Sequence, residues 1–416
     1  MSTTHAVEPA TSVAAAGASR VVSIDIFRGL TMAVMIFVNA LADGAHGLPW
    51  WTYHAHADWD VMTYVDMVFP FFLFIVGMAV PLSVEQRLKR DPSPAKLWLH
   101  VALRTLSLLV LGLILANAEK ADDSLMAIGG NEWALLGLIS AGLYLNVYPK
   151  SRRFPSYAKF LRAAGLIGIV VTFAIFRRTT PSGHVAWIDF SYPEILGLIA
   201  FAYLAVAILY IPTRRWRWAA PFWFVLLVAL NAGCTARAFG LPVRLPIYFW
   251  PFDNGAHACI VMAGVITSQI FLGLHPGKDG RPAAKSATMT AIVFAAIAFV
   301  AGWIAIPLGI SKIRATPTWS LWSIAAAVLV FTLLFWVCDQ YRRTAWAFLL
   351  RPAGSNTLLT YLLPDLWAFL FGALGIVWLD THFKLGWQGV VKTLVFTVLM
   401  LALSWVLTRA KLRLQL

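Results

Sequence analysis

The sequence predicts an all-α polytopic membrane protein with about 12 transmembrane helices (range 10–12), and three observations support this fold class. Of the 416 residues, 60% are hydrophobic and only 12% are charged, whereas soluble domains carry about 25% charged residues. Long apolar runs alternate with short polar loops along almost the whole chain. Lys and Arg gather in alternate loops, as they do in multi-pass membrane proteins. This composition excludes a disordered or fibrous chain.

The apolar runs give the elements in order, because a spanning helix needs about 20 mostly apolar residues. Residues 1–19 are small and polar, and we expect them to form a disordered cytoplasmic tail before a single transmembrane domain over 20–416. The eleventh run contains Pro364, where we expect the helix to break. The twelve runs are 23–43, 65–84, 97–117, 132–149, 161–177, 191–211, 217–236, 255–274, 286–308, 318–338, 345–373 and 388–408.

The loops between these runs predict the orientation of the chain. Loop 44–64, before the second run, has no Lys or Arg. The loop between the second and third runs is rich in cations, and the loop after the third run is again poor in them. Cytoplasmic loops of membrane proteins carry the excess of Lys and Arg, so we expect both termini in the cytoplasm. The net charge of +14 then reflects the excess of Lys and Arg in the cytoplasmic loops, and we expect no nucleic-acid partner. The even-numbered loops and the C-terminus carry Arg87, Lys89, Arg90, Lys96, Lys150, Arg152, Arg153, Lys159, Arg214, Arg215, Arg217, Lys278, Arg281, Lys285, Arg342, Arg343, Arg409, Lys411 and Arg413.

The first helix begins with ionisable residues that a membrane should not contain without a reason. Asp25 and Arg28 are three residues apart, so they can pair on one helix face. Ser23 is a candidate helix cap. Either these residues form a capped, ion-paired helix start, or Arg28 meets an anionic ligand from the cytoplasm.

The loop after the first helix concentrates groups suited to acid–base chemistry. Three of the nine histidines lie within residues 46–56, together with several aspartates. A histidine beside a carboxylate is the usual arrangement for proton transfer near neutral pH. Asn39, at the end of the first helix, and Asp66, at the start of the second, fall at a membrane depth similar to that of His56. We therefore expect these three side chains to face one cavity.

Two other interpretations of this loop have to be weighed. His54 and His56 could contribute to a metal site, but their spacing is not the i, i+4 pair of a helical site and no Cys lies nearby. We therefore expect no metal ion in this loop. Trp50 and Trp51 could belong to the aromatic belt at the membrane surface, although such a belt does not account for the histidines.

Several motifs resemble those of heparan-α-glucosaminide N-acetyltransferase and its bacterial relatives, within the wider group of transmembrane acyltransferases. Weaker similarities occur at Phe252-Asp253-x-Gly255, at Gly309-Ile310-Ser311-Lys312, and at Gly354-Ser355-Asn356-Thr357 with Tyr361. The specific similarity lies in the first fifth of the chain. It comprises Ser23-x-Asp25-x-x-Arg28-Gly29, Val38-Asn39, His56-Ala57-x-Trp59 and Asp66-x-Val68-Phe69-Pro70-x-Phe72-x-Phe74-x-x-Gly77.

The resemblance implies an enzyme that takes an acetyl group from cytoplasmic acetyl-CoA, a co-substrate, and delivers it to an amino sugar or glycan across the membrane. It assigns the catalytic histidine to His56, the active-site amide to Asn39 and the motif carboxylate to Asp66. His56 would act as general base and Asn39 would stabilise the developing oxyanion. A covalent acetyl-histidine and direct transfer both remain open.

The same resemblance leads to further expectations about ligands. The donor is strongly anionic, so we expect it to bind cations, and the acceptor is expected beside the catalytic histidine. A bacterial inner membrane is the expected location, the lipid bilayer and the two substrates are the expected partners, and a homodimer is compatible with such a chain. The expected donor-binding residues are Arg28, Arg104 and Lys312, and the expected acceptor-binding residues are Asp58 and Trp59.

The chain also departs from the family pattern. Val61 stands where the family has Gly, and Leu196-Gly197-Leu198 replaces Leu-Gln-Arg, so a cation that could contact the donor is missing. The twelve predicted helices also exceed the matching core of the family by two. These departures leave two alternatives: a multi-pass transporter or flippase of a small or lipid-linked substrate, or a catalytically altered relative of the acetyltransferases.

Overall fold

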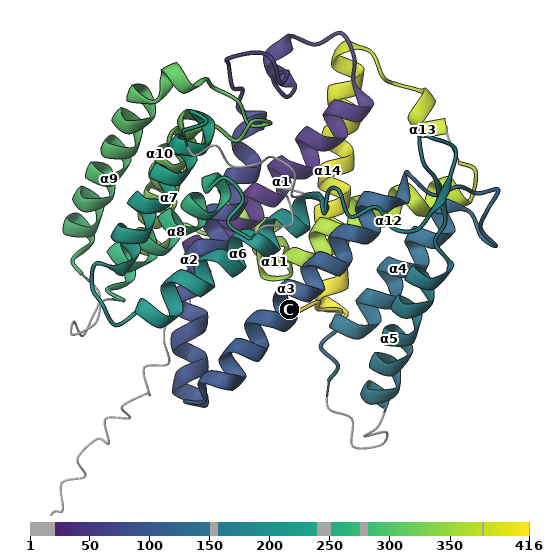
Figure 1. Ribbon diagram of the computed structural model, residues 1–416, viewed down its shortest axis with the longest axis horizontal. Helices are drawn as coiled ribbons and strands as arrows, with labels where there is room; N and C mark the ends of the chain where they lie inside the picture. The colour runs from purple at the N-terminus through teal and green to yellow at the C-terminus, as the bar shows by residue number, and fades with distance from the viewer. Residues whose placement is uncertain (1–20, 150–156, 239–250, 275–281, 377, 416) are drawn as a thin grey trace, which may run out of the picture.

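The computed structural model describes residues 21–149, 157–238, 251–274, 282–376 and 378–415 (Figure 1). Helices dominate it, with one short antiparallel pair of strands, β1 (Arg178–Thr179) and β2 (Val185–Ala186). Short 3₁₀ turns lie at Trp50–Thr52, Val65–Met67, Ile306–Leu308 and Ala345–Ala347. The α-helices are α1 Val22–Gly44, α2 Val68–Arg90, α3 Pro94–Ala118, α4 Gly130–Leu145, α5 Tyr157–Ile175, α6 Glu194–Thr213, α7 Ala219–Thr235, α8 Ala256–Leu272, α9 Ala284–Ile304, α10 Pro317–Leu334, α11 Leu350–Ser355, α12 Thr357–Ala373, α13 Trp378–Thr381 and α14 Gly386–Arg409.

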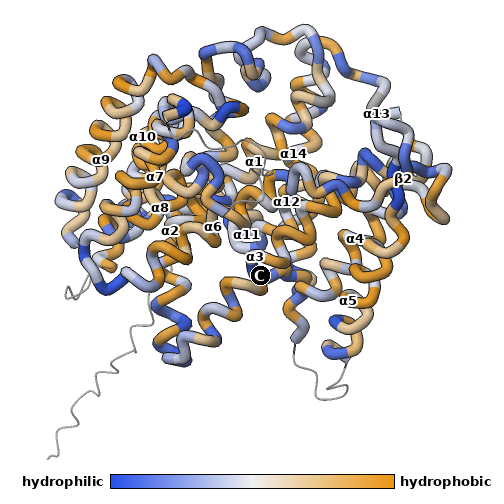
Figure 2. Tube along the Cα trace, viewed as in Figure 1, coloured by the Kyte–Doolittle hydropathy of each residue, from blue (hydrophilic) through white to orange (hydrophobic). Residues whose placement is uncertain are grey.

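Each apolar run of the sequence coincides with helical structure. In the described part of the chain, eight helical segments are long and apolar enough to cross a membrane, and α7, α8 and α12 are shorter apolar helices of 17 residues. Hydrophilic residues gather toward the two ends of the molecule and apolar residues fill the helices between them (Figure 2). The chain is therefore an all-α polytopic membrane protein, as the sequence predicted.

The break in the eleventh run is not where the sequence predicted it. Pro364 lies inside α12, and the helix is instead interrupted at Asn356, between α11 and α12. The backbone of Asn356 has left the helical region, with φ −127° and ψ 50°. A membrane helix tolerates proline when neighbouring helices support it. The Asn356 side chain forms hydrogen bonds with groups that are distant in the sequence. These tertiary hydrogen bonds determine where the helix breaks.

The cap of α1 also differs from the prediction. Ser23 does not cap the helix, because its hydroxyl is buried without a hydrogen-bond partner among the described residues. The backbone N–H groups of Val22 and Ser23 instead donate to the carboxylate of Asp339, at 3.1 and 3.2 Å. Asp339 belongs to the π-helical turn Phe335–Gln340 that follows α10. A carboxylate at a helix N-terminus is favourable both as an acceptor and through the helix dipole.

Close helix packing holds the centre of the bundle. Gly77 of α2 and Gly264 of α8 each lie directly against the backbone of the other helix. A Cβ atom added to Gly77 would meet the carbonyl oxygen of Val261 at 1.8 Å, and one added to Gly264 would meet that of Phe74 at 2.0 Å. Small residues allow membrane helices to approach in this way. This contact places the start of α8 beside the start of α2, where the candidate site lies.

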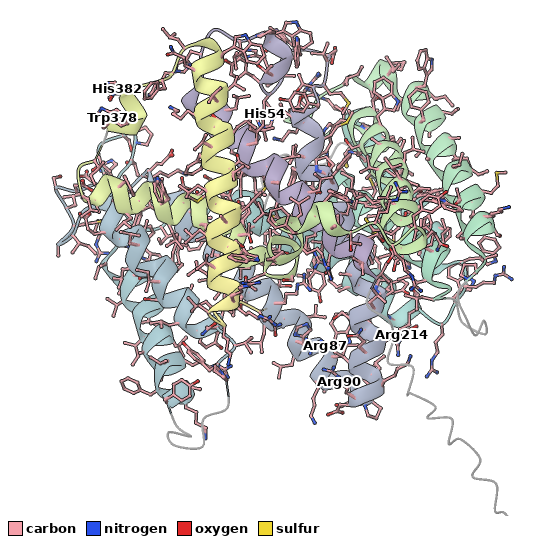
Figure 3. All side chains as sticks on the ribbon, turned by 180° about the vertical axis from the view of Figure 1, so that it is seen from behind. His54, Arg87, Arg90, Arg214, Trp378 and His382 are labelled. Atoms are coloured by element: carbon pink, nitrogen blue, oxygen red, sulfur yellow. The ribbon has the colours of Figure 1, made fainter. Side chains whose placement is uncertain are left out.

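The two ends of the molecule differ in the side chains that they carry. Arg87, Arg90 and Arg214 lie at one end, and His54, Trp378 and His382 lie at the opposite end (Figure 3). We call the first the basic end and the second the histidine end. The separation agrees with the alternation of charge in the loops.

Candidate functional site

The loop between α1 and α2, residues 45–64, is fixed at the histidine end by contacts to a distant segment. His46 forms an isolated bridge with Leu385, in which the His46 N–H donates to Lys384 O at 2.7 Å and the Gly386 N–H donates to His46 O at 2.9 Å. The Tyr53 hydroxyl donates to Ala45 O at 2.9 Å. The loop is therefore held both by its own turn and by the segment before α14.

A histidine–carboxylate pair closes this loop against the start of α2. Asp66 is 1% exposed, and its Oδ1 lies 2.7 Å from Nδ1 of His54. Its Oδ2 accepts hydrogen bonds from the backbone N–H groups of Ala55, at 3.3 Å, and Thr63, at 3.0 Å. These bonds orient the carboxylate. In the tautomer with its proton on Nδ1, His54 donates to Asp66 and Nε2 keeps its lone pair, which is what a general base needs.

Lys312 approaches the same histidine from the loop between α9 and α10. Its Nζ lies 3.3 Å from Nε2 and 3.4 Å from Nδ1 of His54. Burial lowers the pKa of Lys312, and the negative charge of Asp66 partly opposes that shift. Three ionisable groups from three segments therefore meet at one point: His54, Asp66 and Lys312.

The histidine that the resemblance assigned to catalysis lies outside this pair. His56 is exposed, and its ring packs against Trp59 with centroids 4.7 Å apart. Asp66, which we expected to orient His56, binds His54 instead. Asn39 is exposed near the end of α1, and within the described part of the chain it forms no hydrogen bond with either histidine. The structure thus brings together Asp66, His54 and Lys312, but not His56 and Asn39.

The two residues expected to bind the acceptor lie on the surface of the same loop. Asp58 is exposed, and Trp59 is 42% exposed with its indole edge-on to Trp50. The next residue, Asp60, forms an ion pair with Arg314, and its carboxylate also accepts from the Ile310 N–H at 3.2 Å. The Arg314 hydrogen bond, followed by that from Ile310, lowers the pKa of Asp60. This ion pair attaches loop 45–64 to the loop that carries Lys312.

The expected donor-binding cations do not form one group. Arg104 of α3 places its guanidinium 4.6 Å from the ring centroid of Tyr203 on α6, and its Nε is buried without a hydrogen-bond partner among the described residues. Arg87 and His100 are within electrostatic reach of Arg104. Because Arg87 lies at the basic end and His54 at the other, Lys312 is separated from Arg104 (Figure 3).

Arg28 is held at the start of α1 by two contacts. Its Nη1 lies 3.5 Å from Oδ1 of Asp25, as the spacing predicted, and 3.1 Å from the carbonyl oxygen of Gly354 on α11. About 23% of the Arg28 side chain remains exposed. The guanidinium therefore joins α1 to α11.

Sequence reasoning missed two features that the fold brings together. It passed over His54, because only His56 is followed by the Ala-x-Trp pattern of the family. It also missed the pair formed by His257 and Asp253, although the i, i+4 spacing across the start of the eighth apolar run was a usable signal. No local pattern could have shown that Lys312 meets His54, since 258 residues separate them.

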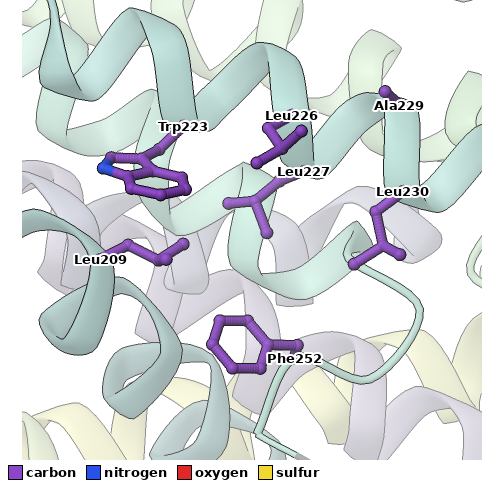
Figure 4. Close-up of a pocket in the computed structure, with 7 residues that line it drawn as sticks. All are labelled: Leu209, Trp223, Leu226, Leu227, Ala229, Leu230 and Phe252. Atoms are coloured by element: carbon purple, nitrogen blue, oxygen red, sulfur yellow. The ribbon is translucent and has the colours of Figure 1, made fainter.

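A ligand cavity and a metal site are two other possible kinds of functional site. A cavity of about 310 Å³ is lined by apolar side chains of α6 and α7 together with Phe252 (Figure 4), so it offers no group for acid–base chemistry. In the described residues, no group of three or more His, Cys, Asp or Glu side chains is placed to hold a metal ion.

Comparisons with known proteins agree with the resemblance found in the sequence. The chain is 38% identical over 111 residues to heparan-α-glucosaminide N-acetyltransferase of Homo sapiens, and 37% identical over 100 residues to that of Mus musculus. These segments cover 27% and 24% of this chain, but only 16% and 14% of the two relatives. A model of a domain of unknown function, DUF5009, matches residues 20–238. Because that match covers just over half of the chain, the protein belongs to the DUF5009 family.

Proposed function

We propose that this protein is a membrane acetyltransferase that moves an acetyl group from acetyl-CoA at its basic end to an amino sugar or glycan at its histidine end. The observation that carries this proposal is the buried Asp66 carboxylate holding His54, with Lys312 beside it. The similarity to proteins named as N-acetyltransferases supports the reaction class.

His54 is the group best placed to take a proton from the acceptor. Its Nδ1 is held by Asp66, so Nε2 can accept the proton from an amine or hydroxyl as the bond to the acetyl carbon forms. The carboxylate then stabilises the imidazolium, and the proton passes to the departing thiolate of coenzyme A. The same arrangement is compatible with direct transfer and with an acetyl-histidine intermediate formed at Nε2. The resemblance assigns this role to His56, so substitutions of His54 and of His56 distinguish the two assignments.

We assign the remaining predicted residues to the two substrates. At the basic end, Arg87 and Arg104 lie within electrostatic reach of each other and form a cationic pair suited to the phosphates of the donor, and Arg28 adds a further cation at the start of α1. At the histidine end, the exposed indole of Trp59 offers a flat apolar face to a sugar ring, beside His56 and Asp58. Asn39 would donate its amide N–H to the thioester oxygen.

The membrane arrangement that we propose follows the charge of the loops. The basic end faces the cytoplasm with both termini, the shorter apolar helices also cross the bilayer, and the membrane is a bacterial inner membrane. The acetyl group would then cross the bilayer between the two ends. A homodimer stays a prediction.

The experiment that tests the function measures acetyl transfer from radiolabelled acetyl-CoA to a panel of amino sugars and cell-wall glycans. His54→Asn and Asp66→Asn should lower the rate by about 10²–10⁴-fold, the usual contribution of a general base. His382→Asn is the matched control, because His382 is an exposed histidine at the same end.

The outcomes separate the possible assignments. Loss of activity in His56→Asn but not in His54→Asn would return the base to His56. Wild-type protein that transfers acetyl to no acceptor, and instead takes up a labelled glycan, would replace the enzyme with a transporter.

A further inference from the structure

A second histidine–carboxylate pair lies beside the first, at the start of α8. Nδ1 of His257 is 3.3 Å from Oδ2 of Asp253, and the two side chains are only 10% and 13% exposed. Ionisable side chains inside a membrane protein are costly and usually functional. This pair takes no part in the reaction proposed above.

The backbone before α8 is shaped to hold this pair. Asp253 has a φ of 47°, which is unfavourable for a residue other than glycine, and Gly255 has a φ of 89°. A Cβ atom added to Gly255 would meet the carbonyl oxygen of Leu227 at 2.6 Å. The Asn254 side chain donates to the carbonyl oxygen of Ala315 at 3.0 Å. The turn is thus fixed against the loop that carries Lys312, and strain of this kind is often found at functional sites.

The imidazole of His257 packs against two aromatic side chains, Phe69 and Trp319, that flank the turn carrying Asp66. It packs edge-to-face against Phe69, with centroids 5.4 Å apart, and against Trp319, at 6.1 Å. Phe69 is one helical turn beyond Asp66. Trp319 is fully buried, and its Nε1–H donates to the backbone carbonyl of Asp66 at 3.0 Å. A chain of direct contacts therefore runs from Asp253 through His257 and Trp319 to Asp66.

The charged and titratable groups around His257 come from each packed element. Asp253 is on its own turn, Asp66 lies in the 3₁₀ turn Val65–Met67 just before α2, and Cys234 of α7 interacts electrostatically with Asp253. Lys312 and Arg314 lie on the loop bound by Asn254. A proton on His257 would place a positive charge in contact with the rings of Phe69 and Trp319, whose uneven charge distribution responds to a neighbouring cation.

We propose that His257, held by Asp253, is a positioning residue that acts through Trp319 and Phe69 to fix the orientation of Asp66. Gain of a proton by His257 changes its contact with Trp319 and, through the indole N–H, the turn that carries Asp66. The kinetic consequence rests on the proposed acetyl transfer, whereas the coupling between His257 and Trp319 does not.

The first test observes Trp319 directly and needs no activity. Protein labelled with fluorotryptophan is titrated by ¹⁹F NMR in detergent, and Trp319→Phe identifies the signal of that residue among the 19 tryptophans. In the wild type, the Trp319 signal should change along the titration, because a proton gained by His257 alters its contact with the indole. The shift should disappear in His257→Phe and His257→Asn. A signal that does not change with pH in the wild type, or that titrates equally in His257→Phe, overturns the proposal.

The second test separates positioning from space filling. His257→Phe keeps an aromatic ring but loses the bond to Asp253, whereas the amide of His257→Asn can still donate to Asp253. We expect His257→Phe to lower kcat by about 10-fold to 10²-fold, a cost typical of a displaced catalytic group, with the KM for acetyl-CoA unchanged. His257→Asn should recover part of kcat and flatten its pH profile.

A purely structural residue would give another pattern. His257→Phe would then keep both kcat and its pH profile, or would fail to fold, which thermal unfolding reveals. Asp253→Asn keeps the histidine and the volume of its partner, and it should reproduce the kinetic defect if His257→Phe does not fold; full wild-type kinetics in that variant would overturn the proposal. If the wild type transfers no acetyl group, the proposed function fails while the ¹⁹F titration still decides the coupling.

Discussion

At the scale of one residue, the charge of Lys312 in the candidate site lowers the stability of the folded protein. Its side chain is half-buried beside His54, and burial lowers its pKa although Asp66 attracts it. A lysine with a lowered folded-state pKa binds its proton more weakly in the folded protein than in the unfolded chain. The folded state therefore gains stability as the pH rises from that lowered pKa toward the usual lysine value of 10.5. At neutral pH the charge is a cost to folding.

Lys312→Met should accordingly raise the thermal unfolding midpoint at pH 7, because it removes a half-buried charge and keeps an apolar side chain. The gain over the wild type should shrink at pH 9.5, where the wild-type amine loses its proton more readily. Unfolding in detergent at both pH values measures this difference. Lys89→Met is the control, since Lys89 is 78% exposed and should change little. A lower midpoint for Lys312→Met at both pH values would show that its contacts stabilise the fold.

The sequence identified much of the site at this scale but not its pairing. The density of His and Asp in loop 45–64 marked the region, and Asp66 was singled out as the motif carboxylate. Which histidine meets Asp66 depends on the path of the loop, since the two histidines are only two residues apart. That path is set by Asp60–Arg314 and by the bridge from His46 to Leu385, and neither contact is local.

At the scale of one element, Asn356 explains why the eleventh apolar run forms two helices. Its buried amide donates to the Thr408 hydroxyl at 3.0 Å and to Leu412 O at 2.8 Å, and its Oδ1 accepts from the Leu414 N–H at 3.1 Å. The chain after α14 is thereby held against the α11–α12 break. Hydrophobicity predicted the run, but it could not predict an interruption determined by residues more than 50 positions away.

Asn356→Ala should destabilise the protein by about 2–4 kcal/mol, because several buried polar groups lose their partner. Limited proteolysis should cut the segment after Arg409 faster in this variant. Thermal unfolding and mass spectrometry of the fragments measure both effects. Ser355→Ala, at the exposed neighbouring position, removes only an exposed local hydrogen bond to Pro352 O and should change neither. Unchanged stability of Asn356→Ala would mean that α14 and its own packing hold the break.

Helix packing gives a second prediction at this scale. Gly77→Ala should prevent correct assembly of α2 and α8, because its Cβ would lie 1.8 Å from a backbone oxygen that cannot move alone. Gly142→Ala in α4 meets nothing within 4 Å, and it should stabilise the helix by up to about 1 kcal/mol. Folded yield by size-exclusion chromatography and thermal unfolding compare the two variants. Equal behaviour of both would contradict the close α2–α8 contact.

The twelve apolar runs gave the order of helices in the whole molecule because hydrophobicity is a local property. The positions of helices relative to one another follow from glycine contacts such as Gly29 against Leu350 O, which no run of hydrophobic residues reveals. The separation of a basic end from a histidine end was predictable from loop charge alone, since the two sets of loops alternate along the chain (Figure 3). That separation is what a donor on one side and an acceptor on the other require.

This whole-molecule arrangement can be tested by the accessibility of single cysteines in intact cells. The background chain has Cys234, Cys259 and Cys338 replaced by alanine. Ser182→Cys lies in the exposed turn between β1 and β2, and Ala95→Cys lies in the exposed first turn of α3 after the basic segment Arg87–Arg90. Because cytoplasmic loops carry the excess of Lys and Arg, a membrane-impermeant maleimide should label Ser182→Cys in intact cells and Ala95→Cys only after the membrane is opened. The reverse pattern would place the basic end outside, and the proposed cytoplasmic supply of acetyl-CoA would fail with it.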